Sequence, residues 1–219
     1  MHITLPAAFL LLAATLTPIP VSPSAPLFEN EQVKVTRAME KHGVQGKFHQ
    51  HDMDRVMVYL QSARQQFEYQ DGRKKEVFDW KAGQVEWNPP TGMHSPLALD
   101  RDFNIVEIEL KNSGTSKAIT SNLDPLKVDP SVYKLEFENP QVRVLRVTIP
   151  PHASTPMHSH STNRVTVLLT DQKFQTKDAS GKTAMVEHKA GDVVWGTPTE
   201  HAEQNLSDQP FEAVTIEVK

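Results

Sequence analysis

The chain repeats itself once, and this repeat constrains the fold more than any other feature of the sequence. The segment that begins at Phe28 aligns without a gap with the segment that begins at Phe137, and 13 of the 33 aligned residues are identical. With two one-residue slips the match continues to the closing segments 103–111 and 211–219. A repeat of about 109 residues is too long for one unit of a solenoid and fits two tandem domains. We therefore expect domains at 25–111 and 132–219, joined by a polar crossover at 112–131.

Each copy has the sequence pattern of a β domain. Segments 32–37 and 55–60, like their counterparts in the second copy, alternate apolar and other residues with a period of two, which is typical of half-buried strands. Asp71-Gly72 and its counterpart Ser180-Gly181 predict hairpin turns. The 16 prolines and 9 glycines favour short strands joined by turns over long helices. The sequence therefore predicts an all-β chain made of two small barrels or sandwiches.

The first 24 residues have the pattern of a secretory signal peptide. The apolar run Leu5–Leu16 has 12 residues, too few to span a bilayer, which takes about 20, but typical of the apolar core of such a peptide. Ser22 and Ser24 supply small residues for cleavage before Ala25. The sequence therefore predicts export to a periplasm or to the extracellular space. A buried N-terminal strand is the alternative.

Composition excludes several classes of partner and site. The net charge of −4 and the pI near 6.2 argue against nucleic acid or an anionic membrane as the main partner, since both favour a basic surface. The chain has no cysteine, so disulfides, thiolate metal sites and thiol nucleophiles are excluded. Any metal must use the ten histidines or the carboxylates. We expect a small-molecule ligand, no membrane contact after processing, and a monomer or homodimer.

Histidines recur at matched positions of the two copies. Each copy has a His-x-His pair, and a third histidine follows about 40 residues later; the two sets are His49, His51 and His94, and His158, His160 and His201. Residues i and i+2 of a strand point to the same face, so a pair of imidazoles can converge on one point. Neutral imidazole binds divalent ions such as Fe, Mn, Ni and Zn. The pattern predicts a metal site in each copy, with hydrogen-bonded core histidines as the alternative.

These motifs resemble those of the cupin superfamily. Gly43, followed after five residues by His49-x-His51, is similar to the first cupin motif, and Gly191, Pro198 and His201 are similar to the second. The second copy has His152 where the first motif has its glycine. The resemblance covers the chain after residue 25 and implies a bicupin, with two tandem jelly-roll barrels of six to eight strands. It also implies that the three histidines of each copy line the barrel interior around a single divalent metal.

The chain departs from the cupin pattern where cupins have a metal-binding Glu, because Arg55 and Arg164 stand there. Arginine has no lone pair to donate, so it cannot be a ligand, and at about 5 Å it would repel a divalent ion by ~7 kcal/mol. Three alternatives remain. The arginine turns outward and leaves a three-histidine site, or it faces inward and binds an anion beside the metal, or the metal is absent and a cationic pocket binds the anion directly. The period-two pattern of 55–60 places its alternate valines in a core and Arg55 on the opposite face of the strand. The cupin pattern places the arginine inside the barrel. We expect Arg55 and Arg164 to be ligand-binding residues inside the barrels.

The sequence therefore predicts an exported bicupin with a His-lined pocket for a divalent metal, a small anionic ligand or both. If it is an enzyme, we expect an oxygenase or isomerase. The alternatives are a non-catalytic protein that binds a sugar or organic acid without metal, and an exported structural protein. Outside the pocket, the matched pair Trp87 and Trp195 predicts core packing, and the matched pair Arg37 and Arg146 predicts an exposed strand face. His188 has no counterpart in the first copy, and we assign it to the surface or to a position behind the ligands.

Overall fold

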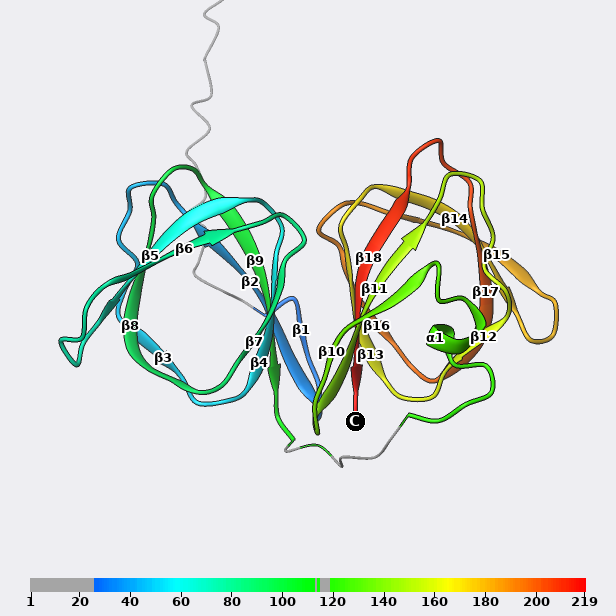
Figure 1. Cartoon of the computed structure of the whole chain (residues 1–219), viewed down its shortest axis with the longest axis horizontal. Coiled ribbons are helices and arrows are strands. Elements are labelled where there is room, and N and C mark those ends of the chain that lie inside the picture. Colours follow the sequence, from blue (N-terminus) through cyan, green and yellow to red (C-terminus); the bar gives the residue numbers. More distant parts are fainter. Residues whose placement is uncertain (1–25, 113, 115–118) are drawn as a thin grey trace, which may run out of the picture.

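Two antiparallel β barrels, one from each copy of the repeat, lie side by side in the computed structural model, which describes residues 26–112, 114 and 119–219 (Figure 1). Barrel 1 contains β1 (Phe28–Glu29), β2 (Val33–Glu40), β3 (His49–His51), β4 (Arg55–Tyr59), β5 (Ala63–Tyr69), β6 (Glu76–Trp80), β7 (Val85–Asn88), β8 (Thr91–Ala98) and β9 (Phe103–Leu110). Barrel 2 contains β10 (Tyr133–Glu138), β11 (Val142–Ile149), β12 (His158–His160), β13 (Arg164–Leu168), β14 (Gln172–Asp178), β15 (Thr183–His188), β16 (Val193–Gly196), β17 (Thr199–Asn205) and β18 (Phe211–Val218). A short helix, α1 (Pro125–Val128), precedes β10. The predicted signal peptide lies outside the described residues.

The two barrels have the same topology. Each consists of a five-stranded and a four-stranded sheet, ordered β1-β2-β9-β4-β7 and β3-β8-β5-β6 in barrel 1, and β10-β11-β18-β13-β16 and β12-β17-β14-β15 in barrel 2. Glycines with a positive φ at the predicted turns, Gly72 at +79° and Gly181 at +87°, close the hairpins β5–β6 and β14–β15. The predicted all-β architecture of two tandem jelly-roll barrels is confirmed.

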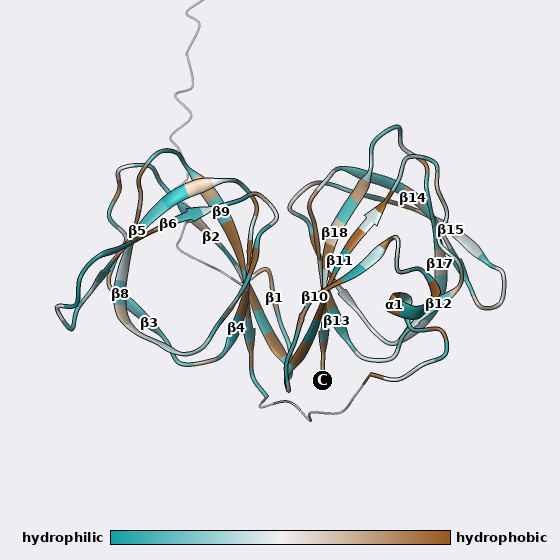
Figure 2. Ribbon diagram, viewed as in Figure 1, coloured by the Kyte–Doolittle hydropathy of each residue, from teal (hydrophilic) through white to brown (hydrophobic). Residues whose placement is uncertain are grey.

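The five-stranded sheets of the two barrels pack against each other. Their contact is a core of branched aliphatic side chains, and Figure 2 shows this apolar band where the barrels meet. Val56 and Val58 of β4 face Val165 and Val167 of β13 in this core, and all four are fully buried. Trp87 and Trp195 pack at its edge, as predicted. Since the valine face of β4 points into the contact between barrels, its other face, which carries Arg55, points into barrel 1.

Two arginines tie each barrel to a turn of the other. Arg37 of β2 donates a hydrogen bond to the carbonyl of Gly191, and Arg146 of β11 donates one to the carbonyl of Gly83 at 2.6 Å. Both glycines have a positive φ, +88° and +76°, and a Cβ at Gly83 would lie 3.1 Å from the Leu169 side chain of the opposite barrel. Both arginines are half-buried. The prediction that they lie on an exposed strand face is wrong, because the partner barrel covers that end of the face.

The second half of the crossover packs on barrel 2. Asp124 caps α1 by accepting a hydrogen bond from the Leu126 amide at 2.9 Å, and Pro125 stands in the first turn, where its missing N–H costs nothing. The Leu123 carbonyl accepts a hydrogen bond from the Ser159 amide of β12 at 2.8 Å. This part of the crossover therefore packs against barrel 2 beside its His-x-His strand, β12. Among the described residues, no helix has the length and apolarity that crossing a membrane requires.

Candidate metal and ligand site

Each barrel brings its three predicted histidines together. One ligand nitrogen from each ring lies within 4.8 Å of the others in both sets. In barrel 1 the ring centroids of His49 and His94 are 4.5 Å apart and those of His49 and His51 are 5.0 Å apart. The corresponding distances in barrel 2, from His158 to His201 and to His160, are 4.5 and 5.2 Å.

The sheet pairing explains this convergence. The His-x-His strand is antiparallel to the strand of the third histidine in both barrels, and the register places His49 opposite His94 and His158 opposite His201. Directly opposed residues of an antiparallel pair lie on the same face of the sheet. We call the sets His49, His51, His94 and His158, His160, His201 triad 1 and triad 2.

Backbone carbonyls orient the imidazoles. The Nδ1 atoms of His49 and His94 lie 2.9 and 2.8 Å from the carbonyl oxygens of Lys47 and Gly92, each two residues earlier in the chain. His158 Nδ1 makes the same contact with Pro156 at 3.1 Å. A ring that donates from Nδ1 presents the lone pair of Nε2, and this arrangement is usual for histidines that bind metals.

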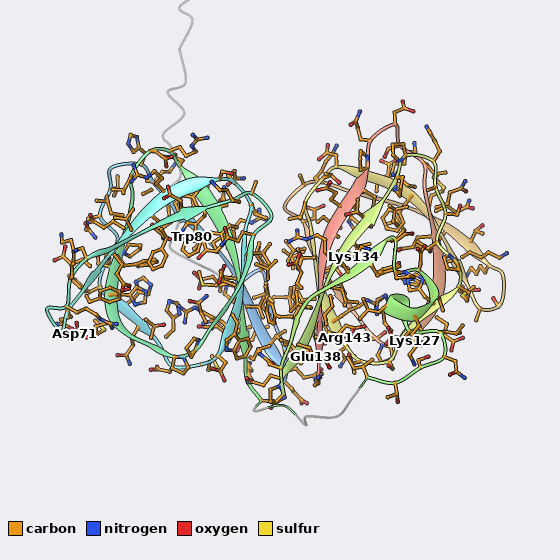
Figure 3. The ribbon with its side chains drawn as sticks, viewed as in Figure 1. Asp71, Trp80, Lys127, Lys134, Glu138 and Arg143 are labelled. Carbon is orange, nitrogen blue, oxygen red and sulfur yellow. The ribbon has the colours of Figure 1, made fainter. Side chains whose placement is uncertain are left out.

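A carboxylate supports one histidine of each triad. Glu217 Oε1 accepts a hydrogen bond from His160 Nδ1 at 2.8 Å, and the matched Glu109 lies 3.7 Å from His51 Nδ1. A cation in turn neutralises each carboxylate: Arg143 bonds Glu217 at 2.5 Å and Lys34 lies 3.0 Å from Glu109. Arg143 also bonds Asp124 of the crossover at 2.6 Å, and Figure 3 shows it near the crossover segment that carries Lys127. A carboxylate behind a metal-binding histidine fixes the ring and raises its basicity.

Burial lowers the pKa values of His51, His158 and His201 and so keeps these imidazoles neutral. Loss of hydration, with a smaller contribution from the charge of Arg55, lowers the pKa of His51 to about 3. In triad 2 the same loss of hydration lowers the pKa of His158 to about 4 and that of His201 to about 2. Neutral imidazole is the form that binds a metal ion.

The residues present fit a divalent metal. Three imidazole nitrogens within 4.8 Å of one another are the donor set that Fe, Mn, Ni and Zn accept in proteins. His201 Nε2 is buried and has no hydrogen-bond partner among the described residues. A buried polar atom without a partner costs about 1–3 kcal/mol, and coordination to a metal would remove that cost.

Arg55 lines the cavity that contains triad 1, and Arg164 lines the cavity of barrel 2 together with His160 and His201. Arg55 is 3% exposed, and its Nη atoms lie 3.4 and 3.5 Å from the Pro89 carbonyl and the Thr91 hydroxyl. Its Nε has no hydrogen-bond partner in the part of the chain that the structure describes. Arg164 Nη1 donates to the Thr197 carbonyl at 2.8 Å. Among the described residues neither guanidinium has a carboxylate within 4.0 Å, so each is a buried or half-buried cation that can bind an anion.

The comparisons with known proteins identify the fold. No family model matches the sequence, and no curated protein matches it either. AerE from Microcystis aeruginosa is similar in structure, with 13% identity, 89% of this chain and 96% of that chain covered, and a TM-score of 0.58. The chain has the bicupin fold. A mutant of Bacillus subtilis oxalate decarboxylase superimposes over 85% of this chain and 69% of its own, with 15% identity and a TM-score of 0.57. A cupin domain from Bordetella pertussis is 27% identical over 40% of this chain and 92% of its own, with a TM-score of 0.38.

Barrel 2 contains two further polar groups beside triad 2. The Tyr133 hydroxyl lies 3.0 Å from His158 Nε2 and donates to Glu203 Oε2 at 3.3 Å. Loss of hydration raises the pKa of Glu203 to about 7, although the hydrogen bond from Tyr133 and the charge of Arg164 oppose the rise. Glu203 can therefore hold or release a proton near neutral pH.

The sequence analysis missed Tyr133, Glu203, Glu109 and Glu217. Only the last two carry a sequence signal, because they occupy matched positions in the closing strands β9 and β18. The position that matches Glu203 is Pro96, so no repeat marks it. His188, which we assigned to the surface or to a position behind the ligands, lines the cavity of barrel 2.

Proposed function

We propose that the protein is an exported bicupin that binds a divalent metal ion in its histidine triads and a small organic anion beside them. The observation that supports this most is that three imidazole nitrogens converge within 4.8 Å in both barrels, with Nδ1 hydrogen-bonded in His49, His94, His158 and His160. A Bacillus subtilis oxalate decarboxylase, which is similar in fold alone, has Mn(II) centres. We expect Fe, Mn, Ni or Zn here.

The side chains around the triads fit chemistry on an anion. A metal ion bound there supplies a Lewis acid that polarises and orients a ligand. Arg55 and Arg164 supply fixed positive charge, which binds a carboxylate and stabilises negative charge that develops on it. In barrel 2, Glu203 can transfer a proton to or from the bound molecule. These features support an oxygenase or an isomerase that acts on a small organic acid.

A specific contact favours the alternative of metal-free binding in barrel 2. The Tyr133 hydroxyl lies 3.0 Å from His158 Nε2, the atom through which this histidine would bind a metal. In this alternative, barrel 2 binds a sugar or organic acid through Arg164, His160 and His201, and only barrel 1 holds a metal.

Metal analysis of the protein, purified without a His-tag or chelator, tests the proposal. We expect about two equivalents of one divalent metal. His49→Ala and His158→Ala should each lose one equivalent, and His152→Ala, which lies outside both triads, should lose none. A single equivalent that only His49→Ala removes would support the alternative for barrel 2. Protein without metal in every preparation, or with metal that neither triad variant removes, would contradict the proposal.

Export rests on the apolar run Leu5–Leu16 and the small residues after it. We expect the full chain, expressed in a Gram-negative host, to accumulate in the periplasm with Ala25 as its first residue. Fractionation followed by N-terminal sequencing measures both. Material in the cytoplasm that retains Met1 or His2 at its N-terminus would contradict export.

A further inference from the structure

The cavity of barrel 1 has an aromatic side that the metal chemistry does not require. Five aromatic side chains line this cavity of about 190 Å³; they are Tyr59, Phe67, Tyr69, Phe78 and Trp80, and we call them the aromatic cluster. The Trp80 indole stacks with the ring of Tyr59, at 4.1 Å and 15°, and with that of Phe78, at 5.1 Å and 6°. A hydrogen bond of 2.8 Å from Trp80 Nε1 to Gln65 Oε1 fixes the indole plane. Figure 3 shows Trp80 in barrel 1, away from the contact between the barrels.

The aromatic cluster reaches triad 1. Phe67 lies edge-on to Phe78, with ring centroids 5.7 Å apart and an angle of 69°, and also edge-on to His94, at 5.4 Å and 77°. A ligand ring that stacks on the cluster is therefore close to the imidazoles of triad 1.

Barrel 2 shows that the fold does not need this cluster. Ala63 pairs with Trp80 in hairpin β5–β6, and Gln172 pairs with His188 in hairpin β14–β15. These pairs show which residues of barrel 2 occupy the positions of the aromatic cluster. The residues that match the aromatic cluster are, in order, Leu168, Thr176, Asp178, Val186 and His188. None of them is Phe, Tyr or Trp. The triads have stayed the same and the cavity walls have diverged, which indicates that the two barrels bind different molecules.

The charged end of the same cavity is Arg55. Its guanidinium is buried, and within residues 26–112, 114 and 119–219 its Nε has no hydrogen-bond partner and no carboxylate lies within 4.0 Å of it. Glu40, Glu86 and Glu107 also line the cavity. Loss of hydration raises the pKa of Glu40 and of Glu107. A raised pKa favours the neutral carboxyl, which repels an anionic ligand less than the carboxylate does. The Glu86 carboxylate accepts a hydrogen bond from the Gln84 amide at 2.7 Å.

We propose that barrel 1 binds a monocyclic aromatic carboxylate, with its ring against the aromatic cluster and its carboxylate on Arg55, next to triad 1. This rests on the proposed function, since the ligand lies beside the metal. A cavity of about 190 Å³ is smaller than the roughly 300–1,000 Å³ of sites for drug-sized ligands, so it holds one ring. The cavity of barrel 2 has aromatic side chains at other positions, namely Tyr133, Phe174 and Phe211, so its ligand differs from that of barrel 1.

Titration of the full protein with benzoate, cyclohexanecarboxylate and acetate tests the proposal. The first two have the same charge and nearly the same size, and only benzoate is planar and aromatic. Since an aromatic pair contributes more than its buried area, we expect benzoate to bind about 3- to 10-fold more tightly than cyclohexanecarboxylate and far more tightly than acetate. Arg55→Gln should weaken benzoate binding by at least about tenfold. The matched Arg164→Gln in barrel 2 should leave it unchanged.

Tryptophan fluorescence locates the ligand. The chain has three tryptophans, and in the W87F/W195F variant Trp80 is the only one left. We expect benzoate to change its emission with the affinity that calorimetry gives. Phe67→Leu, which removes an aromatic face without touching Trp80, should weaken benzoate and not acetate.

The same preparations separate this inference from the proposed function, because their metal content is measured in parallel. Metal in triad 1 together with equal affinities for benzoate and acetate would overturn the aromatic ligand and leave the metal site intact. Benzoate binding that Arg55→Gln abolishes, in protein without metal, would support the ligand and contradict the metal. Benzoate affinity that Arg164→Gln lowers and Arg55→Gln does not would overturn the assignment to barrel 1.

Discussion

Glu217 and Glu109 occupy matched positions, yet we expect their replacement by glutamine to have unequal effects. Glu217 is fully buried and bonds both His160, at 2.8 Å, and Arg143, at 2.5 Å. The side chain of Arg143 is 4% exposed, so in Glu217→Gln this cation keeps Asp124 as its one carboxylate. Glu109, in contrast, faces Lys34, whose side chain is 36% exposed and can turn to water.

The magnitudes follow from these surroundings. Loss of one partner from a buried ion pair costs about 3–5 kcal/mol, and because Asp124 still bonds Arg143 we expect Glu217→Gln to lower the free energy of unfolding by about 3 kcal/mol. A pair with an exposed partner contributes about 0–1 kcal/mol, which is our expectation for Glu109→Gln. Loss of the carboxylate behind His160 should also weaken metal binding in triad 2 by about 10- to 100-fold.

Urea unfolding of the metal-free protein measures the stability change, and titration with Zn²⁺ in a competing chelator measures the affinity. Arg143→Met together with Asp124→Asn in the Glu217→Gln background is the control, since the triple change leaves no buried charge of this network without a partner and should recover part of the lost stability. Equal destabilisation by the two glutamine variants would refute the reasoning, because it would show that the burial of Arg143 has no energetic consequence. An unchanged affinity of triad 2 would refute the role of Glu217 behind the ligand.

Three further predictions concern backbone strain, packing and pH. Gly83→Ala should lower the free energy of unfolding by about 1–3 kcal/mol, as an overpacked site does, and more than Gly72→Ala, since both glycines have a positive φ but only the added Cβ at Gly83 meets the other barrel; equal urea midpoints would contradict this. His152 has a φ of +59°, so His152→Gly should raise the free energy of unfolding by about 0.5–1 kcal/mol, and His152→Ala should not. The pKa of His201 is lowered by burial to about 2, so the unfolded chain binds protons that the folded chain does not, and the metal-free protein should lose stability as the pH falls below about 6.5. Urea midpoints that are constant between pH 7 and pH 5 would contradict the last prediction.

The repeat made the fold predictable, and the same repeat located the triads. Matched histidines at two distant points of each copy, on segments with a period of two, are enough to place three imidazoles on one face once the segments pair. The orientation of Arg55 was harder, because strand parity assumes that one face of β4 is solvated. The valines of that strand face the other barrel, so both faces are buried and parity alone does not say which one lies inside.

Apart from the matched pair Glu109 and Glu217, the features that the sequence did not predict lack a counterpart in the other copy or depend on contact between the copies. Tyr133 and Glu203 have no matched partner, and α1 lies in a crossover that occurs once. Arg37 lies on the same face of β2 as Val33 and Val35, and the packing of a second barrel over the end of that face leaves it half-buried. A pattern within one strand carries no information about a surface that another domain covers.

The valine contact between the barrels has a consequence for how the two halves have changed. A single-copy ancestor with this apolar face could cover it with an identical subunit, and in such a symmetric dimer every substitution appears twice. Fusion into one polypeptide ends that constraint, because a change can then be confined to one half. Trp80 beside one triad and His188 beside the other are differences that two identical subunits cannot have.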